Sequence, residues 1–207
     1  MLKLTNLNQF YGQSHTLWDI SLEVQKGECL CVMGRNGVGK TTLMDTIMGQ
    51  HSIESGTIEF DGEDITKLSV EDRASLGIGY VPQGRQIFPL LTVEENLKIG
   101  IGARRDGLKA VPKAIYDMFP VLYDMRHRQG GDLSGGQQQQ LAIGRALVID
   151  PKLIIFDEPT EGIQPNIVSE IAEIMRRLNK EIGLTVLLVE QKLPFASNMG
   201  DRFYIIV

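Results

Sequence analysis

The sequence is poor in cysteine, in long apolar runs and in basic charge. Its two cysteines, Cys29 and Cys31, lie two apart in a predicted strand, where a disulfide between them would be strained, so we expect reduced thiols in the core. The longest apolar runs, such as 153–156 and 184–189, are strand-sized and far shorter than the roughly 20 residues of a membrane-spanning helix. The net charge of −5 argues against a nucleic-acid-binding surface, which needs a basic excess.

The N-terminus also lacks the features of a secretory signal, because Met1–Phe10 alternates in polarity and has no cationic head followed by an apolar run. A length of 207 residues, with 43% hydrophobic and 23% charged residues, is typical of one soluble domain whose core needs no disulfide or structural metal. We therefore expect a single domain in the cytoplasm.

Short apolar runs between helical segments predict an α/β fold with a largely parallel sheet. The alternation of Leu2, Leu4 and Leu7 predicts an opening strand, and a short helix is expected over 69–76. Further strands are expected at 29–33, 56–60, 78–81, 153–156, 185–189 and 203–207. The last of these ends with the chain and has no following turn, so we expect the natural protein to continue beyond it.

Two segments have helical patterns of different kinds. From Thr92 to about Gly131 no strand signal occurs, which predicts a helical lobe inserted between core strands. Pro165 begins an amphipathic helix. Its apolar stripe is Ile167, Ile171, Ile174, Met175, Leu178 and Ile182.

The segment Gly34-Arg-Asn-Gly-Val-Gly39-Lys40-Thr41 matches the phosphate-binding pattern G-x-x-x-x-G-K-[ST] in full. It follows an apolar strand and precedes a helix, so backbone N–H groups and the positive end of the helix dipole would surround phosphate oxygens. Lys40 would reach the β- and γ-phosphates, and the Thr41 hydroxyl would bind Mg²⁺.

Two carboxylates follow the buried strand at 153–156. Asp157 is at the strand end, where holding Mg²⁺ explains a buried charge, and Glu158 could deprotonate a water that faces the γ-phosphate. A third motif, Leu133-Ser-Gly-Gly-Gln137, predicts a helix that Ser134 caps and that runs to about Val148. Its start is a second anion site, and the natural target is a nucleotide held by another molecule, because the first site already satisfies one triphosphate.

With these three motifs the sequence resembles the nucleotide-binding subunit of ABC transporters over essentially its whole length. The resemblance implies a P-loop NTPase core at about 1–91 and 150–207 with an N-terminal antiparallel β portion. It also implies a helical subdomain at about 92–149, all within one nucleotide-binding domain spanning 1–207. ATP and Mg²⁺ are the implied cofactors.

The resemblance also suggests roles for single residues. Tyr11 is similar to the aromatic residue that stacks on adenine, and Gln83 to the loop glutamine that meets Mg²⁺ and the attacking water. Leu133–Gln137 resembles the signature motif that closes over the partner's ATP. The expected nucleotide-binding residues are Tyr11, Gly34, Arg35, Asn36, Gly37, Val38, Gly39, Lys40, Thr41, Thr42, Ser134, Gly135, Gly136 and Gln137. The expected catalytic residues are Glu158, Gln83 and Gln191, and the expected metal ligands are Thr41, Gln83 and Asp157.

Two positions depart from the family pattern. Gln164 stands where an aspartate is usual, and Gln191 replaces the switch histidine. An amide can donate a hydrogen bond to the γ-phosphate but cannot titrate near neutral pH, so Glu158 becomes the main candidate base. The alternative for Gln191 is an ordinary residue at a strand end.

The segments Glu161–Pro165 and Val189–Gln191 resemble importers of branched-chain amino acids, amides and urea, and the loops at 11–15, 34–39 and 79–85 resemble the urea-importer ATPase most. The implied function is an ATP-hydrolysing subunit at the cytoplasmic face of the membrane, which drives uptake of a small polar solute such as urea. The implied partners are membrane permease subunits, a second ATP-binding subunit and, indirectly, a solute-binding protein. A heterodimer is expected first and a homodimer is the alternative.

Two other classes stay open at this point. A soluble ABC ATPase of DNA repair or translation is disfavoured because the segment between Gln83 and Leu133 is too short for a long coiled coil and the chain holds one cassette. A regulatory module without hydrolysis is suggested by Gln164 and Gln191. The histidines His15, His51 and His127 lack metal-ligand spacing, and Arg104–Arg105 and Arg126–Arg128 are expected to be surface charges or permease contacts.

Overall fold

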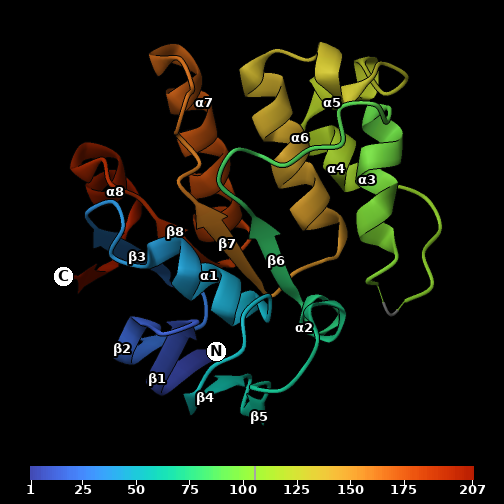
Figure 1. The fold of residues 1–207 in the computed structure, drawn as a ribbon. Helices are drawn as coiled ribbons and strands as arrows, with labels where there is room; N and C mark the ends of the chain where they lie inside the picture. Colours follow the sequence, from blue (N-terminus) through green and yellow to red (C-terminus); the bar gives the residue numbers. More distant parts are fainter. Residues whose placement is uncertain (105) are drawn as a thin grey trace.

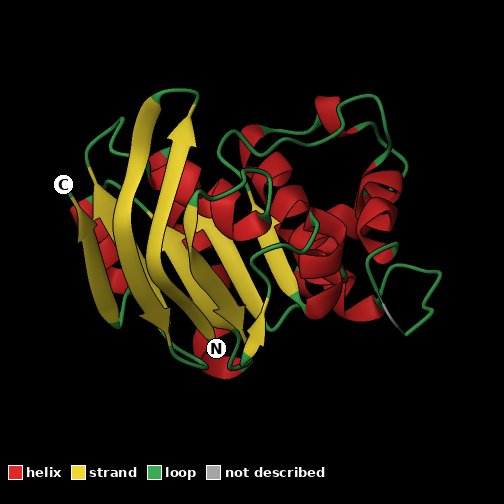
Figure 2. Cartoon of the chain, turned by 60° about the horizontal axis from the view of Figure 1, so that its bottom comes forward, coloured by secondary structure: helices red, strands yellow, loops and turns green. Residues whose placement is uncertain are grey.

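The computed structural model describes residues 1–104 and 106–207; Arg105, one of the residues expected to carry surface charge, lies outside the described residues. The strands gather on one side of the molecule, with a group of helices and long loops on the other (Figure 2). This is the predicted α/β fold, with a parallel sheet and an N-terminal antiparallel portion.

The larger sheet is parallel throughout its five strands, in the order β6-β7-β8-β3-β9. The strands are β3 (Cys29–Gly34), β6 (Ile78–Val81), β7 (Leu153–Asp157), β8 (Thr185–Val189) and β9 (Arg202–Ile206). β7 and β8 are buried along their whole length, as expected for parallel strands that are covered on both faces. The thiols of Cys29 and Cys31 are buried and form no disulfide.

The smaller sheet is antiparallel, in the order β2-β1-β4-β5. Its strands are β1 (Leu2–Tyr11), β2 (Ser14–Val24), β4 (Ser55–Phe60) and β5 (Glu63–Asp64). In β4, Gly56 has a φ of 99°, and a Cβ there would lie 2.6 Å from the carbonyl oxygen of Asn6. Glycine is therefore required where β4 crosses the irregular stretch of β1.

The helices fall into a core group and a lobe, and Figure 1 shows the lobe helices α3 to α6 together at the upper right. The core helices are α1 (Lys40–Met48), α2 (Val70–Leu76), α7 (Pro165–Arg176) and α8 (Leu193–Met199). The lobe helices are α3 (Val93–Ile101), α4 (Lys113–Met118), α5 (Pro120–Asp124) and α6 (Gly135–Val148), with a 3-10 turn at Gly130–Asp132. Thr92 and Ser134 cap α3 and α6 through complete capping boxes, which fixes where both helices begin.

Alternate residues of the parallel strands face two different cores, because successive side chains point to opposite faces of a sheet. Leu30 and Val32 of β3 pack with α1 and the antiparallel sheet. Cys29 and Cys31 pack on the other face, in the core that contains α6, α7 and α8. α1 is thus held between the two sheets, and its first residue is placed at the end of β3.

The predicted amphipathic helix differs from its expected form at its end. α7 passes into a π-helical turn at Arg177–Glu181, where the backbone advances more than 3.6 residues per turn. The apolar stripe continues to Leu178, which is buried, but Ile182 is 58% exposed although the periodicity places it on the buried face. Ile171 and Met175, earlier in the same stripe, are buried as expected.

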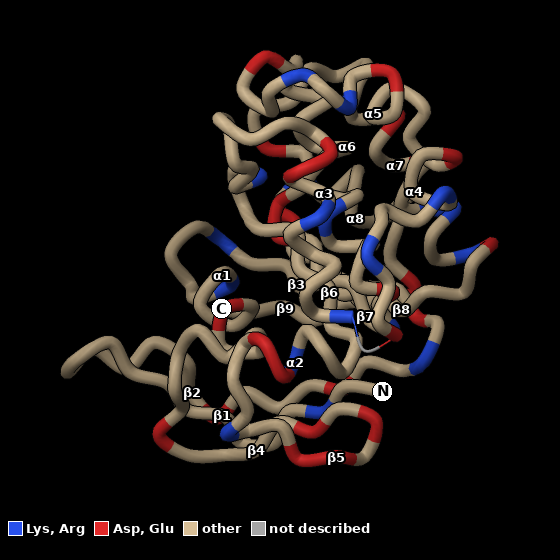
Figure 3. The backbone as a smooth tube through the Cα atoms, turned by 90° about the vertical axis from the view of Figure 1, so that its right-hand side faces the viewer, with Lys and Arg blue, Asp and Glu red and all other residues tan. Residues whose placement is uncertain are grey.

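Charged residues of both signs are spread over both parts of the molecule (Figure 3). Arg126 and Arg128 are at the surface or close to it, and the guanidinium of Arg126 lies 4.2 Å from the centre of the Tyr123 ring. The prediction that the chain binds no nucleic acid stays a prediction.

Candidate functional site

The candidate site lies at the carboxyl edge of the parallel sheet. Because the five strands are parallel, the segments that follow β3, β6, β7 and β8 emerge at one edge, where ligands of open α/β sheets bind. A cavity of about 340 Å³ opens there. It is lined by Thr16, Asn36, Gly37, Gly39, Lys40, Thr41, Thr42, Gln83 and Glu158.

The phosphate loop runs from Gly34 to the start of α1. Gly37 and Gly39 have φ values of 83° and 98°, which side-chain-bearing residues rarely adopt. Gly39 precedes α1 without any side-chain cap, so the first N–H groups of the helix are available to an anion. Of the residues predicted for this loop, Gly34, Arg35 and Val38 do not line the cavity: the carbonyl oxygens of Gly34 and Arg35 accept from Lys40, and Val38 packs against the core.

Lys40 is nearly buried and its ammonium group is fixed by the loop itself. Nζ donates to the carbonyl oxygens of Gly34 at 3.0 Å and Arg35 at 2.9 Å, and lies 3.6 Å from Oε1 of Glu158. The ammonium thus stands between the phosphate loop and the carboxylate that follows β7. This geometry fits a lysine that contacts phosphate oxygens beside the hydrolytic centre.

Glu158 is held in an unusual backbone conformation at the end of β7. Its φ is 48°, a left-handed value that costs free energy in a residue other than glycine. The side chain is 9% exposed, and the Gln191 amide donates a hydrogen bond to its Oε1. Gln191, which we expect from the sequence to donate to the γ-phosphate, thus contacts the candidate base directly.

Asp157 is fully buried, and among the described residues neither of its carboxylate oxygens has a hydrogen-bond partner. Burial raises the pKa of Asp157 to about 6; the Thr41 hydroxyl opposes the shift, while Glu158 and Asp45 add to it. An orphaned carboxylate beside a hydroxyl offers the hard oxygen ligands that Mg²⁺ prefers. The described residues contain no cluster of three or more His, Cys, Asp or Glu able to hold a metal ion. The fit to Mg²⁺ rests on the orphaned Asp157 carboxylate and the Thr41 hydroxyl.

Replacing Asp157 by asparagine should stabilise the protein in the absence of Mg²⁺. The folded state holds the carboxyl proton more tightly than the unfolded chain, so the cost of ionisation is absent below pH 3.8, grows up to about pH 6 and is complete above it. At pH 8, Asp157→Asn should raise the free energy of unfolding by about 1–3 kcal/mol. Each kcal/mol corresponds to a rise of roughly 2–4 °C in melting temperature. Melting curves without metal at pH 8 and pH 5 test this: the gain should shrink at pH 5, and a variant less stable than the native chain at pH 8 would contradict it.

Gln83 reaches the cavity, but its amide is engaged by a residue that sequence reasoning missed. Nε2 donates to Oε2 of Glu161 at 2.8 Å. Arg85, also missed, donates to the Gln138 side chain at 3.1 Å and to the carbonyl oxygen of Gly162 at 3.3 Å. These contacts join the loop after β6 to α6 and to the loop after β7. Nothing in the spacing of these residues along the chain indicates the contacts.

Tyr11 lies outside the cavity, at the end of β1, and is 49% exposed. Its hydroxyl forms a hydrogen bond with Nε2 of His51, whose ring meets the Tyr11 ring edge to face. His51 in turn lies 3.7 Å from Asp45, which accepts a hydrogen bond from Tyr80 at 3.1 Å. Burial and the carboxylates of Asp157 and Asp45 raise the pKa of Tyr80. A chain of polar contacts therefore links Tyr11 to the interior beneath α1, and His51, which has no ligand spacing, is part of it.

The segment Ser134–Gln137 does not join the cavity. Figure 1 shows the start of α6 at the top of the lobe, well separated from the start of α1. The Gln137 side chain accepts from the Ser134 N–H at 2.9 Å. A Cβ at Gly136 would lie 2.6 Å from Cγ2 of Ile167, so this glycine also permits close packing against α7. One chain thus holds two separate parts of the predicted nucleotide site.

A family model described as ABC transporter matches residues 17–161, well over half of the chain and including the phosphate loop, Ser134–Gln137 and Asp157–Glu158. This chain belongs to the ABC transporter family. It is an ATP-hydrolysing subunit of that family.

Individual ABC proteins cover the cassette from end to end. This chain is 40% identical over 207 residues to the high-affinity branched-chain amino acid transport ATP-binding protein BraG of Pseudomonas aeruginosa. The match covers 100% of this chain and 88% of BraG. The probable branched-chain amino acid transport ATP-binding protein LivF of Archaeoglobus fulgidus is 38% identical over 208 residues, with the same coverage. The solved dimeric cassette MJ0796, bound to ADP and Pi, has a TM-score of 0.87 at 28% identity, covering 100% of this chain and 94% of MJ0796.

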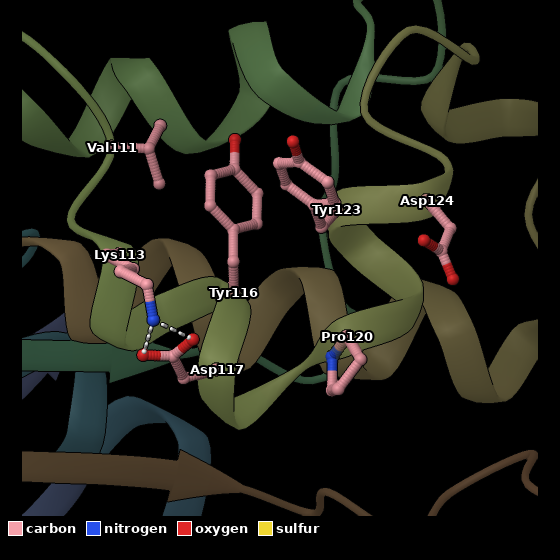
Figure 4. A pocket seen from close by; sticks show the side chains of 7 residues that line it. All are labelled: Val111, Lys113, Tyr116, Asp117, Pro120, Tyr123 and Asp124. Atoms are coloured by element: carbon pink, nitrogen blue, oxygen red, sulfur yellow. Dashed lines mark hydrogen bonds and ion pairs between the residues drawn. The ribbon is translucent and has the colours of Figure 1, made fainter.

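This ABC cassette has a second cavity that lies apart from the nucleotide site. A cavity of about 650 Å³ lies on the lobe between α4 and α5, beside the edge-to-face rings of Tyr116 and Tyr123, and no predicted site residue lines it (Figure 4).

Among the described residues, no helix of the cassette has both the length and the apolar character that crossing a membrane requires.

Proposed function

We propose that this ABC cassette is the motor of an importer, binding and hydrolysing ATP to drive uptake of a small polar solute. The observation that carries the proposal is the convergence of Lys40, Asp157, Glu158 and Gln191 at one edge of the sheet, next to the cavity behind the phosphate loop. Some relatives are named as import ATP-binding proteins, such as the molybdate/tungstate import protein WtpC of Pyrococcus horikoshii, and these names support the direction of transport.

The residue roles follow from this placement. Lys40 and the N–H groups at the start of α1 bind the β- and γ-phosphates. Thr41 and Asp157, with Gln83 beside them, hold Mg²⁺, which when bound neutralises charge on the phosphates. Glu158 accepts a proton from the water that attacks the γ-phosphorus, while the bond from that phosphorus to the ADP oxygen breaks. Tyr11, anchored by His51, stacks on adenine.

Ser134–Gln137 acts on a nucleotide held by a second cassette. The separation of the start of α6 from the cavity and from the start of α1 supports this, because a nucleotide bound at the phosphate loop would lie away from Ser134–Gln137 of the same chain. Two cassettes enclose two ATP molecules, each between the phosphate loop of one and the signature motif of the other. We propose that the second cassette is a related ATPase, so that the dimer is a heterodimer.

A groove of about 480 Å³ between the loop after β6 and the lobe is proposed to receive a helix of the permease. Its lining mixes apolar and cationic side chains: Phe88 is 42% exposed, and the Arg145 guanidinium lies 4.7 Å from the centre of its ring. Arg145 also donates to the carbonyl oxygen of Gln86 at 2.7 Å. Because the loop that carries Gln83 borders the groove, movement of a permease helix there would reach the nucleotide site.

The proposed solute belongs to the group of branched-chain amino acids, amides and urea. The loops at 11–15, 34–39 and 79–85 favour urea, while relatives named for branched-chain amino acid transport favour those amino acids. Residues of the cassette do not touch the solute, so the choice needs a transport measurement.

Uptake by host cells that lack this chain tests the proposal. We expect uptake of labelled leucine or labelled urea to be lost, to return with the native chain and to stay absent with Lys40→Ala. A surface variant, Lys109→Ala, should restore uptake fully. Unchanged uptake of both solutes in the deleted strain would contradict the proposed solute group, and full rescue by Lys40→Ala would contradict the proposed motor.

A further inference from the structure

A buried carboxylate, Glu190, lies between the two catalytic loops of the cassette and is 2% exposed. β7 and β8 are parallel, and Asp157 pairs with Val189, so Glu158 and Glu190 follow neighbouring strands at the same level. Glu190 belongs to none of the sequence motifs predicted to bind nucleotide or metal. Its charge needs partners at this depth, because an uncompensated buried carboxylate is strongly destabilising.

Three donors from two separate loops supply that compensation. Oε2 of Glu190 accepts a hydrogen bond from the Thr160 hydroxyl at 2.8 Å. Oε1 accepts from the backbone N–H groups of Gln191 at 2.8 Å and Lys192 at 3.1 Å. A further contact between the same two loops comes from the Lys192 ammonium, which donates to the carbonyl oxygen of Thr160 at 3.1 Å. The carboxylate therefore ties the loop after β7 to the loop after β8.

The tie fixes the backbone from which the Gln191 side chain extends. That side chain donates to Oε1 of Glu158, the same oxygen that lies 3.6 Å from the Lys40 ammonium. One oxygen of the candidate base thus accepts a hydrogen bond from the Gln191 amide and forms an ion pair with Lys40, and the hydrogen bond depends on where Glu190 holds the loop. Displacement of the loop by about 1 Å would move the amide out of hydrogen-bond range of Glu158.

We propose that Glu190 is a positioning residue for hydrolysis: it holds the Gln191 amide against Glu158 by bonding the loop after β8 to Thr160. The proposal rests on the proposed function, in which Glu158 and Gln191 act in ATP hydrolysis. Glu190 itself is not among the described residues that line the cavity. Its effect is therefore on turnover and passes through Gln191.

A double-mutant cycle separates positioning from a merely structural role, because coupled residues give non-additive effects. We expect Glu190→Ala to lower kcat for Mg-ATP about tenfold with KM changed less than about twofold. In a Gln191→Ala background the same change should lower kcat less than about twofold further. Glu190→Gln should recover most of kcat, because its amide oxygen can accept from both backbone N–H groups and its NH₂ can donate to Thr160.

A second pair of variants covers the case in which Glu190→Ala does not fold. Thr160→Val removes the hydroxyl at nearly constant shape and should lower kcat several-fold, while Thr160→Ser keeps the hydroxyl and most of kcat. If Glu190→Ala and Gln191→Ala reduce kcat by independent factors, or if Thr160→Val turns over like the native chain, the positioning role is wrong. If Gln191→Ala alone leaves kcat unchanged, the proposed role of Gln191 fails, and the inference about Glu190 fails with it. Full turnover by Glu158→Gln would overturn the proposed catalytic site itself.

Discussion

Glu158→Gln should bind ATP as tightly as the native cassette and hydrolyse it at least about 100-fold more slowly. The change removes the proton acceptor while keeping the shape and the oxygen that Gln191 contacts, and loss of a positioned base typically costs a factor of 10²–10⁴. Removing the negative charge beside Lys40 should also favour the ATP-bound dimer. Phosphate release and ATP titration measure the two effects separately.

The matched control for this variant is Glu173→Gln, a charge change of the same kind on the exposed face of α7. It should keep full turnover. Phosphate release by Glu158→Gln within threefold of the native rate would show that another group accepts the proton. The assignment of the catalytic centre to the end of β7 would then be wrong.

Lys40→Ala should weaken ATP binding by roughly 10- to 100-fold. The Lys40 ammonium is nearly buried and is oriented by two backbone carbonyls, so a phosphate would meet it without further ordering. Hydrogen bonds to charged groups contribute about 1.5–3 kcal/mol, which corresponds to the stated loss of affinity. Calorimetric titration with ATP measures the affinity directly.

Lys109→Ala removes the same charge from an exposed position outside the site and should leave ATP affinity within twofold of the native value. Native-like affinity in Lys40→Ala would contradict the phosphate-loop assignment. A melting curve of each variant without nucleotide shows whether a loss of affinity reflects the site or the fold.

The parallel core was predictable to the residue in places. The strands at 78–81 and 185–189 have the predicted bounds, because an uninterrupted apolar run between turn residues has few other stable placements. The strand β2 (Ser14–Val24) was not predicted. It contains exposed polar residues and pairs irregularly with β1, so the alternation of apolar and polar residues along it is weak. Ile182 was misplaced because the π turn before it shifts the helical period.

The candidate site, like the fold, has some features that the sequence predicts and others that it does not. Motif residues such as Lys40 and Asp157 were predictable because phosphate and metal chemistry fixes their spacing along one strand or loop. The contacts of Glu158 with Gln191 and of Glu190 with Thr160 were not, because they join residues about 30 positions apart through the register of β7 and β8. The direction of each side chain where the two loops meet depends on how the loops fold, and the sequence pattern gives no indication of it.

The most direct test of the central claim is a tagged purification of this chain from detergent-solubilised membranes of its host, with identification of the proteins that accompany it. We expect polytopic permease subunits and a second, related ATPase, whose presence would also settle the heterodimer. Recovery of soluble partners alone, with no membrane protein bound, would contradict the motor assignment and favour a soluble ABC ATPase.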